Sequence, residues 1–100
     1  MPIVFATKTV EISRGKGRKD VHSTVTFDSN VKDAAVALNG FQLSFADDED
    51  HRLNVCEVFV EKNSVSGMTV NFTVHCNYSD KNHNDSYRGL VTAFIIADVA

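Results

Sequence analysis

Residues 68–77 have the sequence MTVNFTVHCN, and this stretch decides the fold class. From Met68 to Cys76 every second residue is apolar, and the residues between are polar. An exact period of two is typical of a β-strand that buries one face and exposes the other. Residues 21–27 (VHSTVTF) alternate in the same way. The two stretches therefore predict antiparallel β-structure.

Outward from these two stretches, the rest of the chain shows further strand signals and no sustained helical period. Residues 88–99 are apolar on both faces, as in a central strand covered on both sides. The other predicted strands cover residues 8–12, 34–38 and 53–60, and turns are predicted at residues 14–19, 28–33, 46–50, 62–66 and 79–87. We expect one all-β domain over residues 1–100, a six-stranded antiparallel β-sandwich.

The phase of the alternation slips at two places. It changes from even to odd residues at Asn39-Gly40, and it changes again around Cys56. A bulge shifts the phase inside one strand, whereas Asn-Gly also forms tight hairpin turns. The sequence leaves both explanations open for Asn39-Gly40.

Composition excludes several classes of protein. The chain has 100 residues, 43% of them hydrophobic and 23% charged, with a net charge of −3. This length suits one core and not a two-domain enzyme, and the negative charge gives no general attraction to nucleic acid. No run of apolar residues is long enough to span a bilayer, so no membrane insertion is predicted. The N-terminus lacks the pattern of a signal peptide, which predicts a cytoplasmic or non-classically secreted protein.

Motifs for metal binding or catalysis are incomplete. His75, Cys76, Asp80, His83 and Asp85 are zinc-ligand types, but their spacing lacks the paired pattern of zinc sites. The acidic residues 47–50 likewise lack the alternation of a calcium loop. We therefore predict no metal, no cofactor and no enzymatic activity.

The two cysteines are predicted to be reduced and to point into the core. Cys76 continues the apolar face of residues 70–76, and Cys56 lies in the apolar stretch 53–60. Without a signal peptide, free thiols are the default state.

Two polar segments are candidate binding loops. Residues 74–87 (VHCNYSDKNHNDSY) are rich in side chains that hydrogen-bond hydroxyls, which favours a recognition loop over an inert connection. Residues 14–19 are basic and interleaved with glycine, a composition that suits a phosphate or a sulfated sugar.

The order of these segments resembles the H-type lectin domain, the sugar-binding module of snail agglutinins and of the C-terminal part of discoidins. The resemblance covers about residues 10–99. The matching segments are Thr26-Phe27, Val36 to Leu38, Leu53 to Val55, Ser64 to Met68 and Val91 to Ala97.

The resemblance implies a β-sandwich that binds galactose or N-acetylgalactosamine as a homotrimer or a dimer of trimers. At the family's arginine this chain has Asn54, and at its Trp-His pair it has His75 and Cys76, so an altered specificity is expected. We expect Asn77 and Tyr78 to extend this surface, and Gly17 and Asp20 of an adjacent subunit to close it. The alternative is a protein-assembly or receptor-binding domain that has lost the sugar site.

Overall fold

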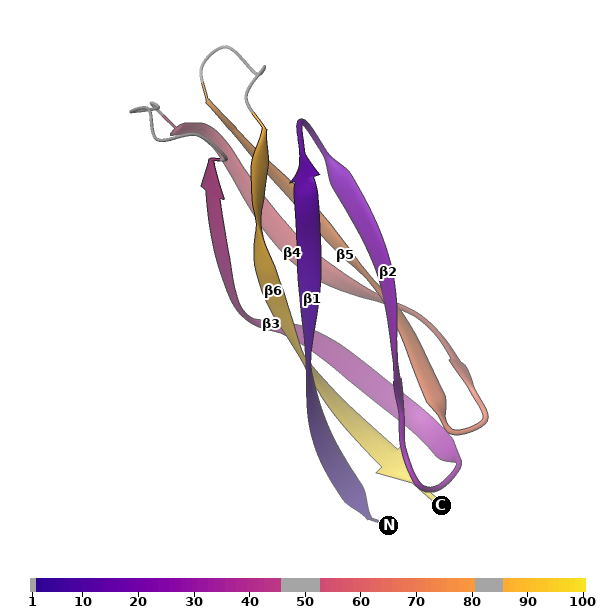
Figure 1. The fold of residues 1–100 in the computed structure, drawn as a ribbon. Helices are drawn as coiled ribbons and strands as arrows, with labels where there is room; N and C mark the ends of the chain where they lie inside the picture. Colours follow the sequence, from indigo (N-terminus) through magenta and orange to yellow (C-terminus); the bar gives the residue numbers. More distant parts are fainter. Residues whose placement is uncertain (1, 46–52, 81–85) are drawn as a thin grey trace.

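Six antiparallel β-strands make up the computed structural model, which describes residues 2–45, 53–80 and 86–100. The strands are β1 (Ile3–Gly15), β2 (Lys19–Thr26), β3 (Val31–Phe45), β4 (Leu53–Ser66), β5 (Thr69–Asp80) and β6 (Tyr87–Val99). They run along a molecule of 50 × 17 × 17 Å, with both termini at the same end (Figure 1). No helix in the described residues is long and apolar enough to cross a membrane.

The strands form two three-stranded sheets, which confirms the all-β, two-sheet architecture. One sheet has the order β1-β6-β3 and the other β2-β5-β4. β6 is central in its sheet, as its two-sided apolar sequence predicts. β5, whose alternation is the cleanest, is central in the other sheet.

The core lies between these two central strands. The inward residues of β5 are almost completely buried: Val70, Phe72, Val74 and Cys76 are 0–1% exposed. Facing them, β6 contributes Tyr87, Val91, Ala93, Ile95, Ala97 and Val99. Since successive strand residues point to opposite faces, burial of the even residues of β5 turns its odd residues to the outer face.

Asn39-Gly40 forms a bulge and not a hairpin. β3 continues through both residues, and its pairing with β6 skips between Leu38 and Gly40. Because of the extra residue, the inward-facing residues are even-numbered before the bulge, as at Val36, and odd-numbered after it, as at Leu43. This accounts for the change of phase in the sequence. The slip predicted around Cys56 lies slightly earlier, between Leu53 and Val55.

The β4–β5 turn is tighter than predicted. β4 runs to Ser66, so the turn predicted at residues 62–66 is wrong, and Gly67 turns the chain with a positive φ of 60°. Met68, predicted to share the apolar face of β5, lies in this turn and is 44% exposed. Its carbonyl instead accepts a hydrogen bond from Phe27 N at 2.8 Å.

The two thiols are free, as predicted, but only one is buried. Cys76 is 1% exposed in the core. Cys56 is exposed, so the prediction that it is a core residue is wrong. The reason is its position on β4, an edge strand of its sheet, whereas Cys76 lies on the central strand.

Gly89 lies where the neighbouring strand leaves no room for a side chain. A Cβ atom at Gly89 would lie 1.9 Å from the backbone carbonyl oxygen of Gln42 on β3. A Cβ at Gly40, by contrast, would have no heavy atom within 4 Å. The β3–β6 pairing therefore requires glycine at residue 89.

We predict that Gly89→Ala destabilises the fold, whereas Gly40→Ala does not. The added methyl group at residue 89 must displace backbone, and such overpacking typically costs about 1–3 kcal/mol. Urea unfolding of both variants measures the difference. Equal midpoints for Gly89→Ala and the wild type would contradict the close approach of β3 to β6.

Candidate functional site

A row of three side chains crosses the outer face of the sheet β2-β5-β4. His75 on β5 pairs with Asp20 on β2 and with Phe59 on β4. Each strand thus contributes one outward residue at the same level of the sheet. Glu61, two residues beyond Phe59 on the same strand, also points outward. Arg18 lies at the entry to β2. These five residues, Arg18, Asp20, Phe59, Glu61 and His75, are called the His75 cluster below.

His75 lies between two carboxylates. Its Nδ1 is 2.5 Å from Asp20 Oδ1, and its Nε2 is 3.2 Å from Glu61 Oε1. Its ring stacks on Phe59, with the centroids 4.6 Å apart and the planes at 24°. These contacts hold the imidazole on three sides, and only 15% of its side chain is exposed.

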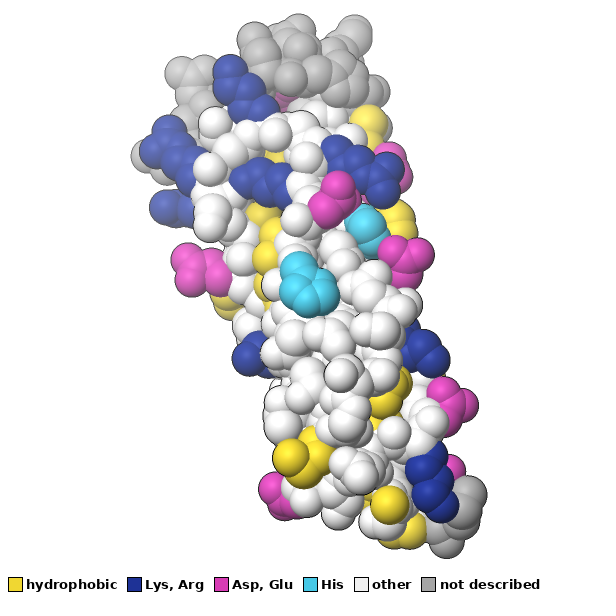
Figure 2. Space-filling view, turned by 90° about the vertical axis from the view of Figure 1, so that its right-hand side faces the viewer, with side chains coloured by type: hydrophobic (Ala, Val, Ile, Leu, Met, Phe, Trp, Pro, Cys, Tyr) yellow, Lys and Arg dark blue, Asp and Glu magenta, His cyan; other side chains and the backbone are white. Residues whose placement is uncertain are grey.

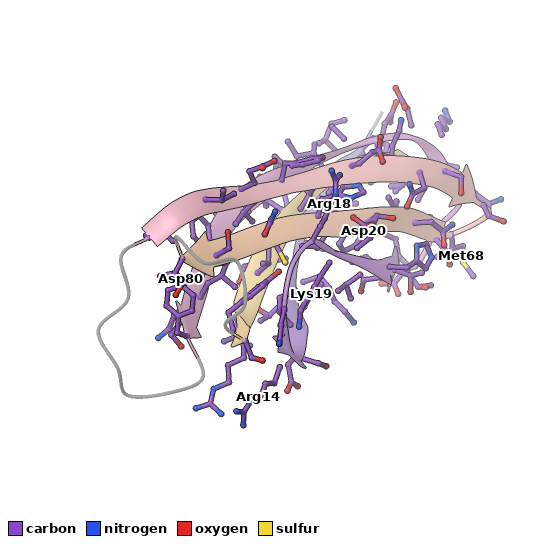
Figure 3. All side chains as sticks on the ribbon, turned by 90° about the horizontal axis from the view of Figure 1, so that it is seen from above. Arg14, Arg18, Lys19, Asp20, Met68 and Asp80 are labelled. Atoms are coloured by element: carbon purple, nitrogen blue, oxygen red, sulfur yellow. The ribbon has the colours of Figure 1, made fainter. Side chains whose placement is uncertain are left out.

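Arg18 completes the cluster. Its Nε donates to Asp20 Oδ1 at 3.4 Å, and its guanidinium carbon lies 5.8 Å from the centroid of the Phe59 ring. A cation over an aromatic face is attracted to the ring's negative quadrupole. Figure 3 shows Arg18 and Asp20 over the β4 and β5 ribbons. Figure 2 shows histidine side chains on this face among acidic and basic ones.

The β1–β2 turn that carries Arg18 is fixed by a buried tyrosine. The hydroxyl of Tyr87 donates to the carbonyl oxygen of Gly17 at 2.6 Å, and lies 3.2 Å from that of Cys76. Burial raises the pKa of Tyr87 well above its ordinary value, so the hydroxyl stays protonated and remains a donor. Lys19 Nζ lies 5.0 Å from the centroid of the ring. The turn is thereby anchored to both sheets.

The cluster perturbs the titration of its own members. The hydrogen bond to Asp20 raises the pKa of His75 above its ordinary 6.5; partial burial opposes this, and Glu61 supports it. The same bond lowers the pKa of Asp20 below 3.8. The His75 contribution to stability is full below pH 6.5 and is lost as the pH rises through the raised pKa. The Asp20 contribution is full above pH 3.8 and is lost as the pH falls through the lowered pKa.

The exposed members of the cluster are the ones that a ligand can reach. Asp20 and Glu61 have side chains 55% and 61% exposed, Arg18 56%, and Phe59 as a residue 43%. They offer carboxylate acceptors, a forked donor and an apolar ring on one face. His75 is largely covered and acts as the residue that positions both carboxylates.

The part of the chain that the structure describes contains no arrangement of side chains suited to a metal ion. No group of three His, Cys, Asp or Glu side chains there is placed to hold an ion. In the His75 cluster the two carboxylates bond to opposite nitrogens of one ring, so the three do not converge on a common point. Residues 47–50, His83 and Asp85 lie outside the described residues.

The predicted sugar-site residues are only partly brought together. Asp20 contacts His75 within one chain, so no adjacent subunit is needed to bring it there. Asn77 is on the same outer face, opposite Glu57, and its buried Oδ1 has no hydrogen-bond partner among the residues that the structure describes. Gly17 lies in the neighbouring turn with a φ of 73°.

Three predicted residues lie apart from His75. Cys76 is in the core, and Tyr78 packs on the core side, its ring centroid 4.8 Å from that of Phe45. These two residues do not share a surface with His75, contrary to the prediction, because successive residues of β5 point to opposite faces of the sheet. Asn54 lies on β4 near the register shift at Leu53, five residues before Phe59, or about 16 Å along a strand.

Sequence reasoning missed Phe59 and Glu61, and it singled out Arg18 only as part of the basic segment 14–19. The apolar residues Val58 and Val60 imply that Phe59 and Glu61 point outward, so their orientation was available from the sequence. Their proximity to His75 follows from the pairing of β4 with β5, which no local pattern encodes.

Comparison with protein-family models, with curated proteins and with solved structures finds no match to this chain. Any assignment of function must therefore come from the residues of the site.

We predict that NMR titration gives His75 a pKa above 6.5, and that Asp20→Asn lowers it toward that value. Asp20→Asn removes the main partner of the imidazolium. Asp33→Asn is the matched control, since it removes the same charge from an aspartate that pairs with Lys62. A pKa of His75 that is the same in Asp20→Asn and wild type would refute this arrangement of the cluster.

Proposed function

We propose that this protein is a carbohydrate-binding module whose ligand lies on the His75 cluster. The observation that carries the proposal is the exposed Phe59 ring flanked by the carboxylates of Asp20 and Glu61 and the guanidinium of Arg18. An aromatic ring packs against the apolar C–H face of a sugar, while carboxylates and guanidinium bind hydroxyl groups. The resemblance to H-type lectins supports a galactose-type ligand, with a specificity altered by the different side chains.

The geometry supports weak binding at each site. The cluster lies on the open face of a sheet, so it buries less of a ligand than an enclosed pocket does. Strand positions hold the side chains rigidly, which limits the entropic cost of binding. Useful avidity would then come from several sites on one oligomer.

We propose a homotrimer, or a dimer of trimers, as the source of these several sites. The outer face of the sheet β1-β6-β3 is apolar near the start of β1. Ile3 and Phe5 are 52% and 63% exposed, and Phe5 stacks on Phe94 with the centroids 5.7 Å apart. Burying such a face against further copies adds to the small core of a 100-residue chain.

The second candidate is a protein-assembly or receptor-binding domain without sugar binding. The same apolar face favours it, since contiguous exposed apolar surface marks interaction sites. Binding on a glycan array separates the two functions: a reproducible sugar signal supports the module, and silence from the intact oligomer supports assembly.

We predict that Phe59→Ala weakens binding to the sugar that the array identifies. Loss of an aromatic contact of about 1 kcal/mol corresponds to roughly fivefold in affinity. Glu61→Gln should weaken binding too, by replacing a charged acceptor with a neutral amide.

Thr24→Ala is the control for both variants, because Thr24 is exposed on the same sheet face, four residues along β2 from Asp20. All three residues are exposed, so the variants should keep the fold. Unchanged binding in both Phe59→Ala and Glu61→Gln would place the sugar elsewhere.

We predict that light scattering gives three or six times the chain mass of 11.0 kDa, and that Phe5→Ser shifts the mass toward that of the single chain. Removing the most exposed of these apolar side chains weakens the contact between copies. Met68→Ser removes an exposed apolar side chain from the β4–β5 turn instead, and should leave the mass unchanged. A wild-type mass of one chain at micromolar concentration would exclude the trimer.

A further inference from the structure

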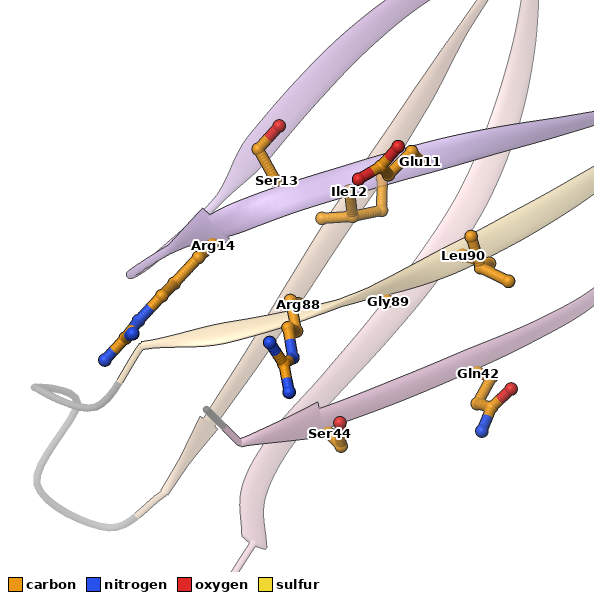
Figure 4. Close-up of a pocket in the computed structure, with 9 residues that line it drawn as sticks. All are labelled: Glu11, Ile12, Ser13, Arg14, Gln42, Ser44, Arg88, Gly89 and Leu90. Carbon is orange, nitrogen blue, oxygen red and sulfur yellow. The ribbon is translucent and has the colours of Figure 1, made fainter. Parts of the chain in front are cut away.

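A hollow of about 430 Å³ opens on the outer face of the sheet β1-β6-β3, across the molecule from the His75 cluster. All three strands line it (Figure 4). The lining residues are Glu11, Ile12, Ser13, Arg14, Gln42, Ser44, Arg88, Gly89 and Leu90. The exposed Phe5 lies far from it, since Phe5 pairs with Ile96, eight residues or about 26 Å along β6 from Arg88.

A bulge in β1 places a second arginine, Arg14, in the lining of this hollow, on the strand next to that of Arg88. Ile12 pairs with Gly89 and Gly15 with Tyr87, so Ser13 and Arg14 together oppose Arg88 alone. Bulges of this two-against-one kind re-aim side chains and are frequent beside functional sites. In Figure 4, Arg14 extends outward past the end of β1, whereas Arg88 points toward β3.

Among the residues that the structure describes, neither guanidinium has an ion-pair partner. Within residues 2–45, 53–80 and 86–100, Arg14 and Arg88 form no ion pair or hydrogen bond through their side chains. Like charges on neighbouring strands destabilise a sheet. An anion held between the two guanidinium groups would remove this repulsion.

The other polar groups of the hollow suit an oxyanion. Ser44 pairs directly with Arg88 from the β3 side, and Gln42 follows two residues away. Their hydroxyl and amide groups are neutral donors, and arginine forks match the oxygens of sulfate and phosphate. The one carboxylate, that of Glu11, lies toward Leu90 and away from the two guanidinium groups in Figure 4.

Further basic side chains lie at the same end of the described chain. Although the net charge is −3, five of the ten lysines and arginines lie at this end of the described chain: Arg14, Lys16, Arg18, Lys19 and Arg88. Figure 2 shows the basic side chains concentrated at that end.

We propose that Arg14 and Arg88, with Ser44 and Gln42, form a binding site for a tetrahedral oxyanion, a sulfate or phosphate group carried on a small molecule. The bulge at Ser13-Arg14 builds the site by setting a second arginine beside Arg88. It lies on the opposite sheet from the His75 cluster and does not depend on sugar binding there.

The test is an NMR titration of the protein with sodium sulfate at constant ionic strength. We expect amide shifts confined to the hollow, around Arg14, Ser44, Arg88 and Gly89. Arg88→Gln should weaken the apparent affinity for sulfate at least several-fold. Arg88→Lys should have an affinity between those of the wild type and Arg88→Gln, because lysine keeps the positive charge but lacks the paired N–H donors of the guanidinium group. Glu11→Gln should tighten binding slightly, by removing the one carboxylate among the lining residues of the hollow.

Lys8→Gln is the matched control, because Lys8 lies on β1 like Arg14 and its loss changes the net charge equally. Equal weakening in Lys8→Gln and Arg88→Gln would overturn the proposal and reduce the effect to general electrostatics. Absence of confined shifts at millimolar sulfate and millimolar phosphate would overturn it as well.

Two further ligands identify the source of the anion. Glucose 6-sulfate and glucose 6-phosphate are compared with glucose under the same conditions. Tighter binding of either ester than of glucose at the hollow supports the site. The ester with the higher affinity indicates whether the site prefers a sulfate or a phosphate group. Equal binding of all three would contradict it.

Discussion

Burial of one face of β5 against one face of β6 is the constraint on which the rest of the structure depends. Val70, Phe72 and Val74 are 0% exposed, as are Val91 and Ala93 opposite them. In a strand, fixing the inward residues fixes the outward ones, since a slip of one residue would turn the whole apolar set to solvent. The positions of His75 and of Arg88 on their outer faces are therefore set by the core beneath them.

Each central strand holds a different chemistry on its outer face. β5 carries His75, which two carboxylates and an aromatic ring surround. β6 carries Arg88, which has a second arginine beside it through the bulge in β1. The first arrangement has its charges compensated internally, and it offers exposed acceptors and a ring. The second has no ion-pair partner among the residues that the structure describes, and we propose it as a place for an anion. The proposed sugar site and oxyanion site follow from this contrast.

Tyr87 connects the two arrangements. It lies in the core between the sheets, one residue before Arg88, and its hydroxyl donates to the carbonyl of Gly17 in the β1–β2 turn. That turn leads from the bulge with Arg14 to Arg18 and Asp20 in the His75 cluster. A residue that is fully buried thus fixes the backbone from which both surface sites project.

The sequence by itself determined the fold class, the number of strands, the central place of β6 and the outward direction of His75, because a period of two is a local property of the chain. It also placed Cys76 in the core. Tertiary structure decided what lies next to what. Phe59 and Glu61 contact His75, and Arg14 lies on the strand next to that of Arg88, only through the register of strands distant in sequence. It also decided that Cys56 is exposed and that Asn39-Gly40 is a bulge, since strand order and pairing depend on the whole sheet and not on the residues beside each position.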